Sequence, residues 1–470
     1  MSDTSLTILG GGPAGVAVAH YAQRAGIPFH VFERNDAFGG LCRTFTCGPH
    51  RYDSGAHRFH ARDADVTADI RALLGDELVA IHAPSQIYDR GRFVDFPPRP
   101  LNWLRGRGVV ETVRAVGDVW AARLRPRPEH TFEDRALNLY GRRLAEPLLI
   151  RYSEKLWGLP AHELAPDVAT RRLAGLSLKT ALVEMLAPER TTTHLDGSFF
   201  YPRQGYGTIV DRLMASLPAH TLRPRHEVTG LECVDGRIAA LRFADGSTWQ
   251  VGGRVVATLP MTAMVQWLGG MLPDAVHRAA AQLRFRHVRL VVLRLAIPRC
   301  TANASIYLPD PALCVSRVSE PKNRSPHMAP ADETCLVAEV PCSNGEPLAS
   351  LATTELAARV IRELAGVGLV DPAKVIEWRH HFLPNAYPVY ALEYAPAATA
   401  VRDGLATITN LDLLGRSGRF WYSHLHDQLR LAKDYVRALP VFGSTLTFAE
   451  QHGGAHPEVG DEAVVRPPAA

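Results

Sequence analysis

The stretch SLTILGGGPAG at residues 5–15 decides the fold of this chain. It contains three spaced glycines, Gly10, Gly12 and Gly15, in a Gly-x-Gly-x-x-Gly pattern. In such a turn the first glycine allows a tight bend, and the second lets the backbone approach a pyrophosphate. The third lets a helix pack closely on a strand. The pattern therefore predicts a dinucleotide-binding turn between a strand and a helix.

The segments around this turn complete a β-α-β unit. Residues 5–9 predict a short buried strand, Val16–Arg24 a helix, and Ile27–Glu33 a second strand. Glu33 lies 18 residues after Gly15, where a carboxylate accepts hydrogen bonds from the adenosine ribose. The N–H groups and dipole of the helix N-terminus hold the phosphates. A Rossmann-type domain follows, with FAD and NAD both open from this motif alone.

The composition is that of an ordinary globular protein with room for several domains. The chain has 470 residues, 46% hydrophobic and 21% charged, and a formal net charge of +4. Because no basic stripe with interleaved aromatics stands out, a nucleic-acid partner is not expected. The seven cysteines are scattered without a Cys-x-x-Cys pair, which favours a cytoplasmic protein with reduced thiols and gives no metal site. No apolar run reaches the ~20 residues of a transmembrane segment.

The rest of the chain alternates between helical and strand patterns. Helical patterns occupy residues 64–75, 100–185, 349–365 and the stretch through Leu439. Strand patterns occupy residues 78–96, 196–260, 285–320, 334–341 and 405–414, with hairpin signals at Asp235-Gly236 and Asp245-Gly246. Strand-turn-helix units thus stand at both ends, which predicts a cofactor domain built from separate segments around a substrate domain.

The stretch that follows the second strand selects the cofactor. Residues 33–44, ERNDAFGGLCRT, resemble the extended fingerprint of the FAD-dependent amine oxidase and protoporphyrinogen oxidase superfamily. That fingerprint is an acid, a short spacer, Gly-Gly, a basic residue and Thr. The resemblance implies FAD, with the Gly-Gly loop along the pyrophosphate and ribityl chain. Arg43 offers a forked guanidinium for a phosphate there.

Further segments resemble bacterial oxidoreductases related to protoporphyrinogen oxidase and eukaryotic-type UDP-galactopyranose mutases. They lie in the expected order at residues 52–59, 151–158, 200–207, 319–323 and 415–422. The resemblance implies an α/β fold: a Rossmann-type FAD-binding domain, a mixed-sheet substrate domain and a helical insertion. The predicted FAD-binding domain comprises residues 1–100, 196–260 and 401–443, with the insertion at 101–195, the substrate domain at 261–400 and a flexible tail at 444–470.

The residues and the resemblance together give a set of expected binding residues. Those for FAD are Gly10, Gly12, Gly15, Glu33, Arg34, Gly40, Arg43, His57, Val228, Gly415 and Arg416. Those for substrate are Arg172, Arg317, Tyr387 and Tyr422. Two arginines hold the substrate diphosphate in the mutases, and Arg172 and Arg317 are their nearest matches here.

The expected catalytic residues are histidines and one aspartate. The resemblance places His57 near the flavin ring, where an imidazole orients the ring or carries a proton. His424, His426 and Asp427 precede a predicted helix. They read either as a general base or ligand pair, or as a helix cap made by Asp427. The relatives carry Asn-Met-Asp-His-Ser at this point, so the sequence departs from the family pattern beside the flavin.

Two enzymatic interpretations remain open from the sequence. The first is a FAD-dependent oxidoreductase that passes a hydride from a small molecule to flavin N5. The second is a redox-neutral mutase of a nucleotide sugar that works with reduced flavin. The altered segment at residues 424–428 favours the first. A flavin-bound protein without turnover is disfavoured because the flavin segments are complete. The expected partner is a small, anionic substrate such as a nucleotide sugar, and a homodimer stays open.

Overall fold

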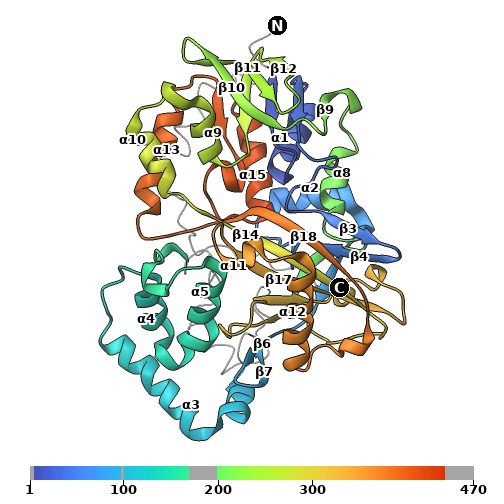
Figure 1. Cartoon of the computed structure of the whole chain (residues 1–470), viewed down its shortest axis with the longest axis vertical. Coiled ribbons are helices and arrows are strands. Elements are labelled where there is room, and N and C mark those ends of the chain that lie inside the picture. The colour runs from blue at the N-terminus through green and yellow to red at the C-terminus, as the bar shows by residue number, and fades with distance from the viewer. Residues whose placement is uncertain (1–4, 97–99, 169–197, 440–470) are drawn as a thin grey trace.

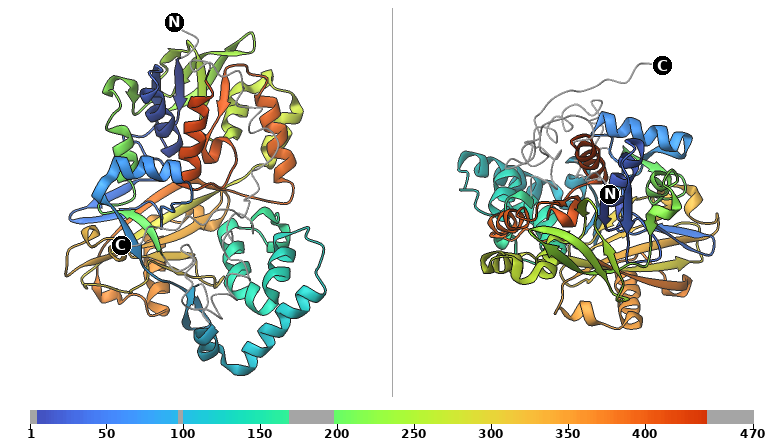
Figure 2. Two further views of the ribbon diagram at one scale, coloured as in Figure 1. Left: turned by 180° about the vertical axis from the view of Figure 1, so that it is seen from behind. Right: turned by 90° about the horizontal axis from the view of Figure 1, so that it is seen from above.

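The computed structural model describes residues 5–96, 100–168 and 198–439. A parallel sheet lies near the N-terminus, a larger mixed sheet crosses the middle, and a group of helices forms the opposite end (Figure 1). Figure 2 shows the same three parts from behind and from above. This arrangement confirms the predicted α/β fold class. Among the described residues, no helix is long and apolar enough to cross a membrane.

The sheet nearest the N-terminus has five parallel strands in the order β19-β13-β1-β2-β9. Its strands are β1 (Leu6–Leu9), β2 (Phe29–Phe32), β9 (Leu222–Arg223), β13 (Arg254–Ala257) and β19 (Leu411–Leu413). β1 is fully buried, as parallel strands covered on both faces are. Helix α1 (Pro13–Arg24) joins β1 to β2, and Pro13 begins it, a position where the missing N–H costs nothing.

The last helix of the described chain packs against the first. α15 (Leu425–Arg437) lies along α1, with α2 (Ala64–Leu74) and α8 (Thr208–Met214) beside them. Lys433 of α15 donates to Asp65 and Asp69 of α2 at 2.7 Å, and Arg430 forms a forked pair with Asp63 at 2.6 and 2.7 Å. Segments from the beginning and the end of the described chain therefore pack together in the same part of the molecule.

An antiparallel sheet and three helices flank the other side of the parallel sheet (Figure 1). The sheet consists of β10 (Val228–Val234), β11 (Arg237–Phe243) and β12 (Thr248–Gln250), and its two turns confirm both predicted hairpins. The helices are α9 (Met261–Leu268), α10 (Asp274–Gln282) and α13 (Tyr394–Leu405). None of the three was among the helices expected from the sequence. The expected strand at 405–414 is corrected as well: Leu405 ends α13, residues 406–410 form turns, and only β19 is extended.

The mixed sheet has seven strands in the order β18-β14-β17-β16-β15-β6-β7. They are β6 (Ser85–Asp89), β7 (Arg92–Phe96), β14 (Phe285–Leu295), β15 (Ser305–Tyr307), β16 (Arg317–Ser319), β17 (Thr334–Cys342) and β18 (Val375–Pro388). The long strands β18, β14 and β17 lie side by side at one edge of the sheet. The predicted amphipathic helix is α12 (Thr353–Gly366), which packs on β14 and β18, while the short α11 (Pro347–Ser350) contacts β17.

Two small antiparallel pairs connect the two large sheets. The hairpin β3 (Thr44–Cys47) and β4 (His50–Asp53) lies against the mixed sheet, and β5 (Leu78–His82) pairs with β8 (Ser198–Pro202). The hairpin brings the segment that follows the Gly-Gly loop onto β17. It therefore links the parallel sheet to the mixed sheet.

The end of the molecule opposite the N-terminus is helical (Figure 1). It contains α3 (Pro100–Leu124), α4 (Phe132–Ala145), a π-helical turn (Glu146–Ile150) and α5 (Arg151–Trp157). Gly108 and Gly141 adopt non-helical conformations that kink α3 and α4. Residues 169–197 of the predicted insertion and the predicted tail at 444–470 lie outside the described residues.

Candidate flavin site

The glycine turn has the geometry that its spacing predicts. Gly10 has a φ of +100°, and a Cβ on Gly15 would lie 2.0 Å from the Gly10 carbonyl oxygen. Helix α1 therefore approaches the turn too closely for any side chain at position 15. A Cβ on Gly12 would meet nothing within 4 Å. The open space at Gly12, at the N-terminus of α1, is where a pyrophosphate fits.

Glu33 is fixed beside this turn at the end of β2. Its buried carboxylate accepts hydrogen bonds from the Gly11 backbone N–H at 2.9 Å and from the Asn35 backbone N–H at 3.0 Å. The His226 N–H donates to the Glu33 carbonyl at 2.9 Å, which holds the segment leading to buried Val228 alongside. This is the position from which a carboxylate reaches a ribose.

Two further loops converge on the same helix end. A Cβ on Gly40 would lie 3.0 Å from the Gly12 Cα, and the Gly39 N–H donates to the Gly11 carbonyl at 2.8 Å. From the far end of the chain, Gly415 has a φ of +77° and approaches the Ala14 side chain. The structure thus brings together Gly10, Gly12, Gly15, Glu33, Gly40, Val228 and Gly415.

The two remaining basic residues of the predicted pyrophosphate site occupy different positions. Arg34 is exposed. Arg43 lies against Gly39, and its guanidinium is 5.0 Å from the centre of the Phe45 ring. FAD binding by Arg34 and a phosphate contact of Arg43 stay predictions.

A buried aspartate joins three of the segments that carry the family resemblance. Asp53 accepts hydrogen bonds from the Thr44 hydroxyl at 2.6 Å, the Tyr201 hydroxyl at 2.5 Å and the Tyr206 N–H at 2.9 Å. Burial raises its pKa in spite of these donors. Sequence reasoning quoted each segment but did not connect them through Asp53.

His57 lies between this aspartate network and several arginines. Its ring stacks on Tyr206 at 4.9 Å, and Nε2 lies 3.2 Å from the Ser54 hydroxyl oxygen. Burial, followed by the positive charges of Arg317 and Arg416, lowers the His57 pKa to about 3. His57 is therefore uncharged near pH 7. It can orient a bound group by hydrogen bonding, but it does not hold the second ring proton of an imidazolium.

Arg416 points toward the aromatic residues that sequence reasoning placed at the substrate. Its guanidinium lies 5.1 Å from the Tyr422 ring and 5.9 Å from the Tyr387 ring, and these two rings stack at 5.9 Å. One Arg416 nitrogen donates to the Ala386 carbonyl at 3.2 Å. Its Nε is buried and has no hydrogen-bond partner within the described part of the chain. An unpaired donor here suits an acceptor atom of a bound cofactor.

A second layer of aromatic rings supports Tyr422. Tyr390 stacks on Tyr394 at 4.2 Å and on Trp157 at 5.8 Å, and the Tyr422 N–H donates to the Tyr390 hydroxyl at 2.6 Å. Trp157 and Tyr390 are buried. These residues hold the position of Tyr422 by packing.

Arg317 already has a carboxylate partner. It forms a forked pair with Glu339, with N···O distances of 3.0 and 2.7 Å, and Glu339 also accepts from the Ala56 N–H at 3.1 Å. Arg317 therefore stands next to the His57 segment, and its predicted contact with a substrate anion stays a prediction. Arg172, the other predicted anion ligand, lies outside the described residues.

Sequence reasoning missed two further arginines at this site. Arg324 is 2% exposed and donates to the Ala304 carbonyl at 2.8 Å, while Arg58 donates to the Ser85 hydroxyl at 2.7 Å. Burial and then the charge of Arg317, among other groups, lower the pKa of both. Arg324 Nε is buried without a partner among the described residues. The abundance of arginine in this chain hid them as signals.

His424 and Asp427 cap the N-terminus of α15, and His426 lies in its first turn. His424 is the N-cap residue, and its N–H donates to the Asp427 carboxylate at 2.7 Å in a capping box. His426 lies 3.3 Å from Asp427 and stacks on His424 at 5.6 Å. Burial lowers the pKa of His424 to about 4. This geometry favours the capping interpretation. The described residues contain no group of three or more side chains able to hold a metal ion.

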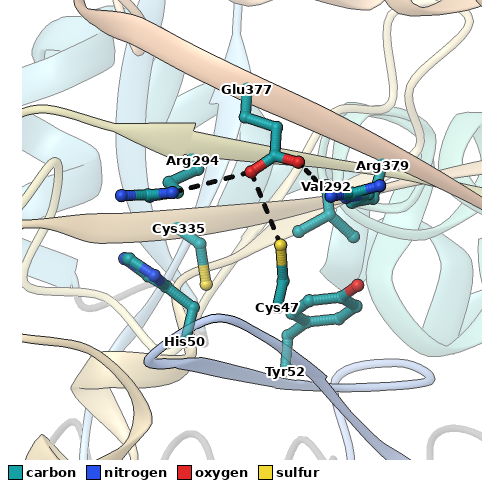
Figure 3. A pocket seen from close by; sticks show the side chains of 8 residues that line it. All are labelled: Cys47, His50, Tyr52, Val292, Arg294, Cys335, Glu377 and Arg379. Carbon is teal, nitrogen blue, oxygen red and sulfur yellow. Dashed lines mark hydrogen bonds and ion pairs between the residues drawn. The ribbon is translucent and has the colours of Figure 1, made fainter.

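A small pocket lies between the β3–β4 hairpin and the mixed sheet, apart from these residues (Figure 3). Glu377 crosses it, 3.6 Å from Arg294 and paired with Arg379, and accepts from the Cys47 thiol at 3.5 Å. The hydrogen bond and ion pairs of Glu377 connect the hairpin to the mixed sheet. Because Glu377, Arg294 and Arg379 are already paired with one another, we do not assign this pocket to the flavin.

Comparison with known proteins agrees with this geometry. The sequence matches the model of the flavin containing amine oxidoreductases over residues 13–421. The chain belongs to this family. Its cofactor is therefore FAD, and the fit to the site is good: an open glycine turn, a fixed acid and an unpaired buried donor at Arg416. The superfamily resemblance predicted from the sequence is confirmed.

Solved structures of other flavoenzymes share the fold of this family member. Reduced UDP-galactopyranose mutase is 17% identical with a TM-score of 0.79, covering 93% of this chain and 95% of that chain. A protein of Exiguobacterium sp. 255-15 named for protoporphyrinogen oxidase is 21% identical with a TM-score of 0.73, covering 93% and 99%. Putrescine oxidase bound to putrescine is 15% identical with a TM-score of 0.62, covering 93% and 98%. No curated protein sequence matches the chain.

Proposed function

We propose that this flavin containing amine oxidoreductase is a FAD-dependent enzyme that oxidises a small anionic molecule. When bound, FAD accepts a hydride from a substrate C–H bond at flavin N5. The observation that supports FAD binding is the convergence of Gly12, Gly40 and Gly415 on the N-terminus of α1. The family match over residues 13–421 supports the reaction class.

The protein residues supply binding, orientation and charge. The glycine turn and Glu33 hold the ADP half of the cofactor, and Arg416 offers its unpaired Nε to the flavin half. His57, neutral and held by Ser54 and Tyr206, presents a hydrogen-bonding nitrogen without adding a positive charge. A neutral imidazole leaves the local positive charge to the arginines.

The charge balance of the site favours an anionic substrate. Four arginines, Arg58, Arg317, Arg324 and Arg416, surround the His57 segment. The carboxylates among them are Glu339 and Asp53, and burial raises the pKa of Asp53. Buried cations without matching anions are costly, so a carboxylate or phosphate on the substrate would stabilise the filled site.

The same surplus of arginine also suits the diphosphate of a nucleotide sugar, which keeps a mutase as the second candidate. Tyr387 and Tyr422 form a stacked pair beside Arg416 that would fit a planar base or a sugar face. This alternative differs from the first in its electron balance, because a mutase returns the flavin to its starting redox state.

Two anaerobic assays separate these candidates. In the first, oxidised holoenzyme meets a panel of small carboxylates, phosphate esters and their neutral analogues with a redox dye. Dye reduction by anionic members, and not by the neutral analogues, is the expected result. In the second, reduced holoenzyme meets UDP-galactose. Formation of the furanose without net flavin oxidation would establish the mutase and defeat the oxidoreductase proposal.

A further inference from the structure

Helix α3 presents an exposed apolar stripe at the end of the molecule opposite the N-terminus (Figure 1). Six large apolar side chains lie on the part of α3 that follows the kink at Gly108: Val109, Val110, Val113, Val116, Trp120 and Leu124. Trp120 is 61% exposed and Leu124 77%. Surface helices of water-soluble proteins turn such residues inward. The described part of the chain leaves this stripe uncovered.

The stripe is distinct from the face by which α3 packs on the protein. Ala115 and Val119 are buried where α3 lies against α4. With 3.6 residues per turn, Val113 and Trp120 point roughly a third of a turn away from that packing face. α3 therefore has two apolar faces, one already used for packing on α4 and one directed outward.

Arginines border the outward face. The segment from residue 105 to 127 contains six arginines and two acidic residues. By the helical period, exposed Arg114 and Arg123 lie on opposite sides of the stripe. A Trp-containing apolar stripe between arginines is the composition of helices that lie in the interface of a bilayer with anionic headgroups.

The dimensions of the stripe favour a bilayer over a second copy of the chain. The stripe is one helix wide and, at 1.5 Å per residue, about 24 Å long. Such a strip alone falls short of the roughly 800 Å² per partner that a stable protein interface buries. A bilayer needs only one helix immersed by about 5–10 Å. Seen from the front and from behind, α3 lies at an outer edge of the molecule (Figures 1 and 2).

We propose that α3 docks this protein peripherally on a bilayer rich in anionic phospholipid. Val113, Val116 and Trp120 enter the boundary between headgroups and acyl chains, and Arg114 and Arg123 contact lipid phosphates. The docking is independent of the reaction at the flavin, so it stands or falls separately from the proposed function.

Vesicle flotation with the FAD-loaded full chain tests this proposal. The vesicles are phosphatidylcholine alone, or phosphatidylcholine mixed with phosphatidylglycerol. The wild type is expected to float with the anionic vesicles, more weakly with the neutral ones, and less as salt rises. V113E/W120E is expected to lower the partition coefficient at least tenfold. The matched control V234E/I376E places the same charges on exposed apolar positions of β10 and β18 and is expected to bind as the wild type does.

Flavin absorbance and thermal unfolding establish that each variant is folded. A second variant, R114Q/R123Q, keeps the stripe and is expected to weaken binding to anionic vesicles and flatten its salt dependence. It decides the matter if V113E/W120E does not fold. Absence of flotation, or equal losses in V113E/W120E and the control, would overturn the proposal. A second result would also overturn it: light scattering shows that the wild type is a dimer, V113E/W120E is a monomer, and the wild type does not bind vesicles.

Discussion

At the residue scale, two glycines of the same turn have different physical duties. Gly15 is required by the fold, because its Cβ would overlap the Gly10 carbonyl oxygen at 2.0 Å. Gly12 has free space around its Cα and a φ of −70°, which any residue adopts. The need for glycine at position 12 therefore arises only when a pyrophosphate is bound.

This difference predicts that replacement by alanine affects a different property at each of the two positions. Gly15→Ala should lower the thermal stability of the apoprotein, by the ~1–3 kcal/mol typical of overpacking. Gly12→Ala should leave apoprotein stability within about 0.5 kcal/mol and weaken FAD binding at least tenfold. Calorimetry of apoprotein and fluorescence titration with FAD measure the two effects. Unchanged FAD affinity in Gly12→Ala would show that the phosphates lie elsewhere.

His57 couples the site to pH. Its pKa in the folded protein, about 3, is below the ordinary value of 6.5, so the unfolded chain binds a proton that the folded chain refuses between these values. The stability contributed by neutral His57 is complete above pH 6.5 and is lost as pH falls toward 3. The loss is at most about 1.4 kcal/mol per pH unit.

His57→Gln should therefore flatten the acid limb of the stability curve. Between about pH 7.5 and pH 5, the variant should lose roughly 1–2 kcal/mol less unfolding free energy than the wild type does. Urea denaturation at both pH values measures this. His162→Gln, at a side chain that is 65% exposed, is the control and should follow the wild type. Parallel curves for all three proteins would mean that His57 titrates normally in the fold.

At the scale of elements, single long side chains hold loops in place. Lys155 of α5 donates to the carbonyls of Leu308, Asp310 and Val315 at 2.7, 2.8 and 2.7 Å. Burial lowers its pKa to about 8. The ammonium thus ties the helical end of the molecule to the loop between β15 and β16.

Lys155→Met should release this loop, since three carbonyls lose their charged donor. We expect a loss of about 2–4 kcal/mol in unfolding free energy and faster hydrogen exchange confined first to residues 308–316. Lys374→Met, at an exposed lysine, should change neither. If hydrogen exchange in Lys155→Met were no faster than in the control, the three hydrogen bonds of Lys155 would not stabilise the loop.

Patterned elements were predictable, whereas buried or context-dependent ones were not. β1, α1 and β2 follow from glycine spacing and apolar periodicity, and the hairpins from Asp-Gly pairs with positive φ, as at Asp235 and Gly236. α9 is largely apolar, with the sequence MTAMVQWL, so it shows no clear helical period. The apolar positions of residues 405–414 predicted one strand, but Leu405 ends α13, residues 406–410 form turns and only Leu411–Leu413 is extended.

The same holds for the site. Gly10, Gly12, Gly15 and Glu33 are local in sequence, so spacing alone indicates their roles. Asp53, Arg58, Arg324 and Glu339 act through partners far along the chain, and no local pattern marks them. His424, His426 and Asp427 had two interpretations because a helix cap and an active-site cluster use the same types of residue. Only the capping hydrogen bond of Asp427 distinguishes them.

At the scale of the whole molecule, the flavin site joins the two ends of the chain. Gly415 approaches Ala14 next to the glycine turn, and α15 packs on α1. In the proposed site the glycine turn would hold the ADP half of FAD, whereas Arg416 lies near His57, Tyr387 and Tyr422. We infer that one cofactor bound in this way would contact both the parallel sheet and the aromatic residues beside the mixed sheet, and would stabilise the packing of the two.

This division predicts that FAD and ADP stabilise the apoprotein differently. At a concentration 100 times its Kd, FAD should add about 2.7 kcal/mol, and ADP at the same concentration should add less because it lacks the flavin half. Arg416→Gln should reduce the Tm shift produced by FAD and leave the shift produced by ADP unchanged. Each shift is measured from the ligand-free Tm of the same variant, since Arg416 also donates to the Ala386 carbonyl. If the substitution diminished both shifts equally, Arg416 would belong to the pyrophosphate site, and the flavin ring would have to be placed without it.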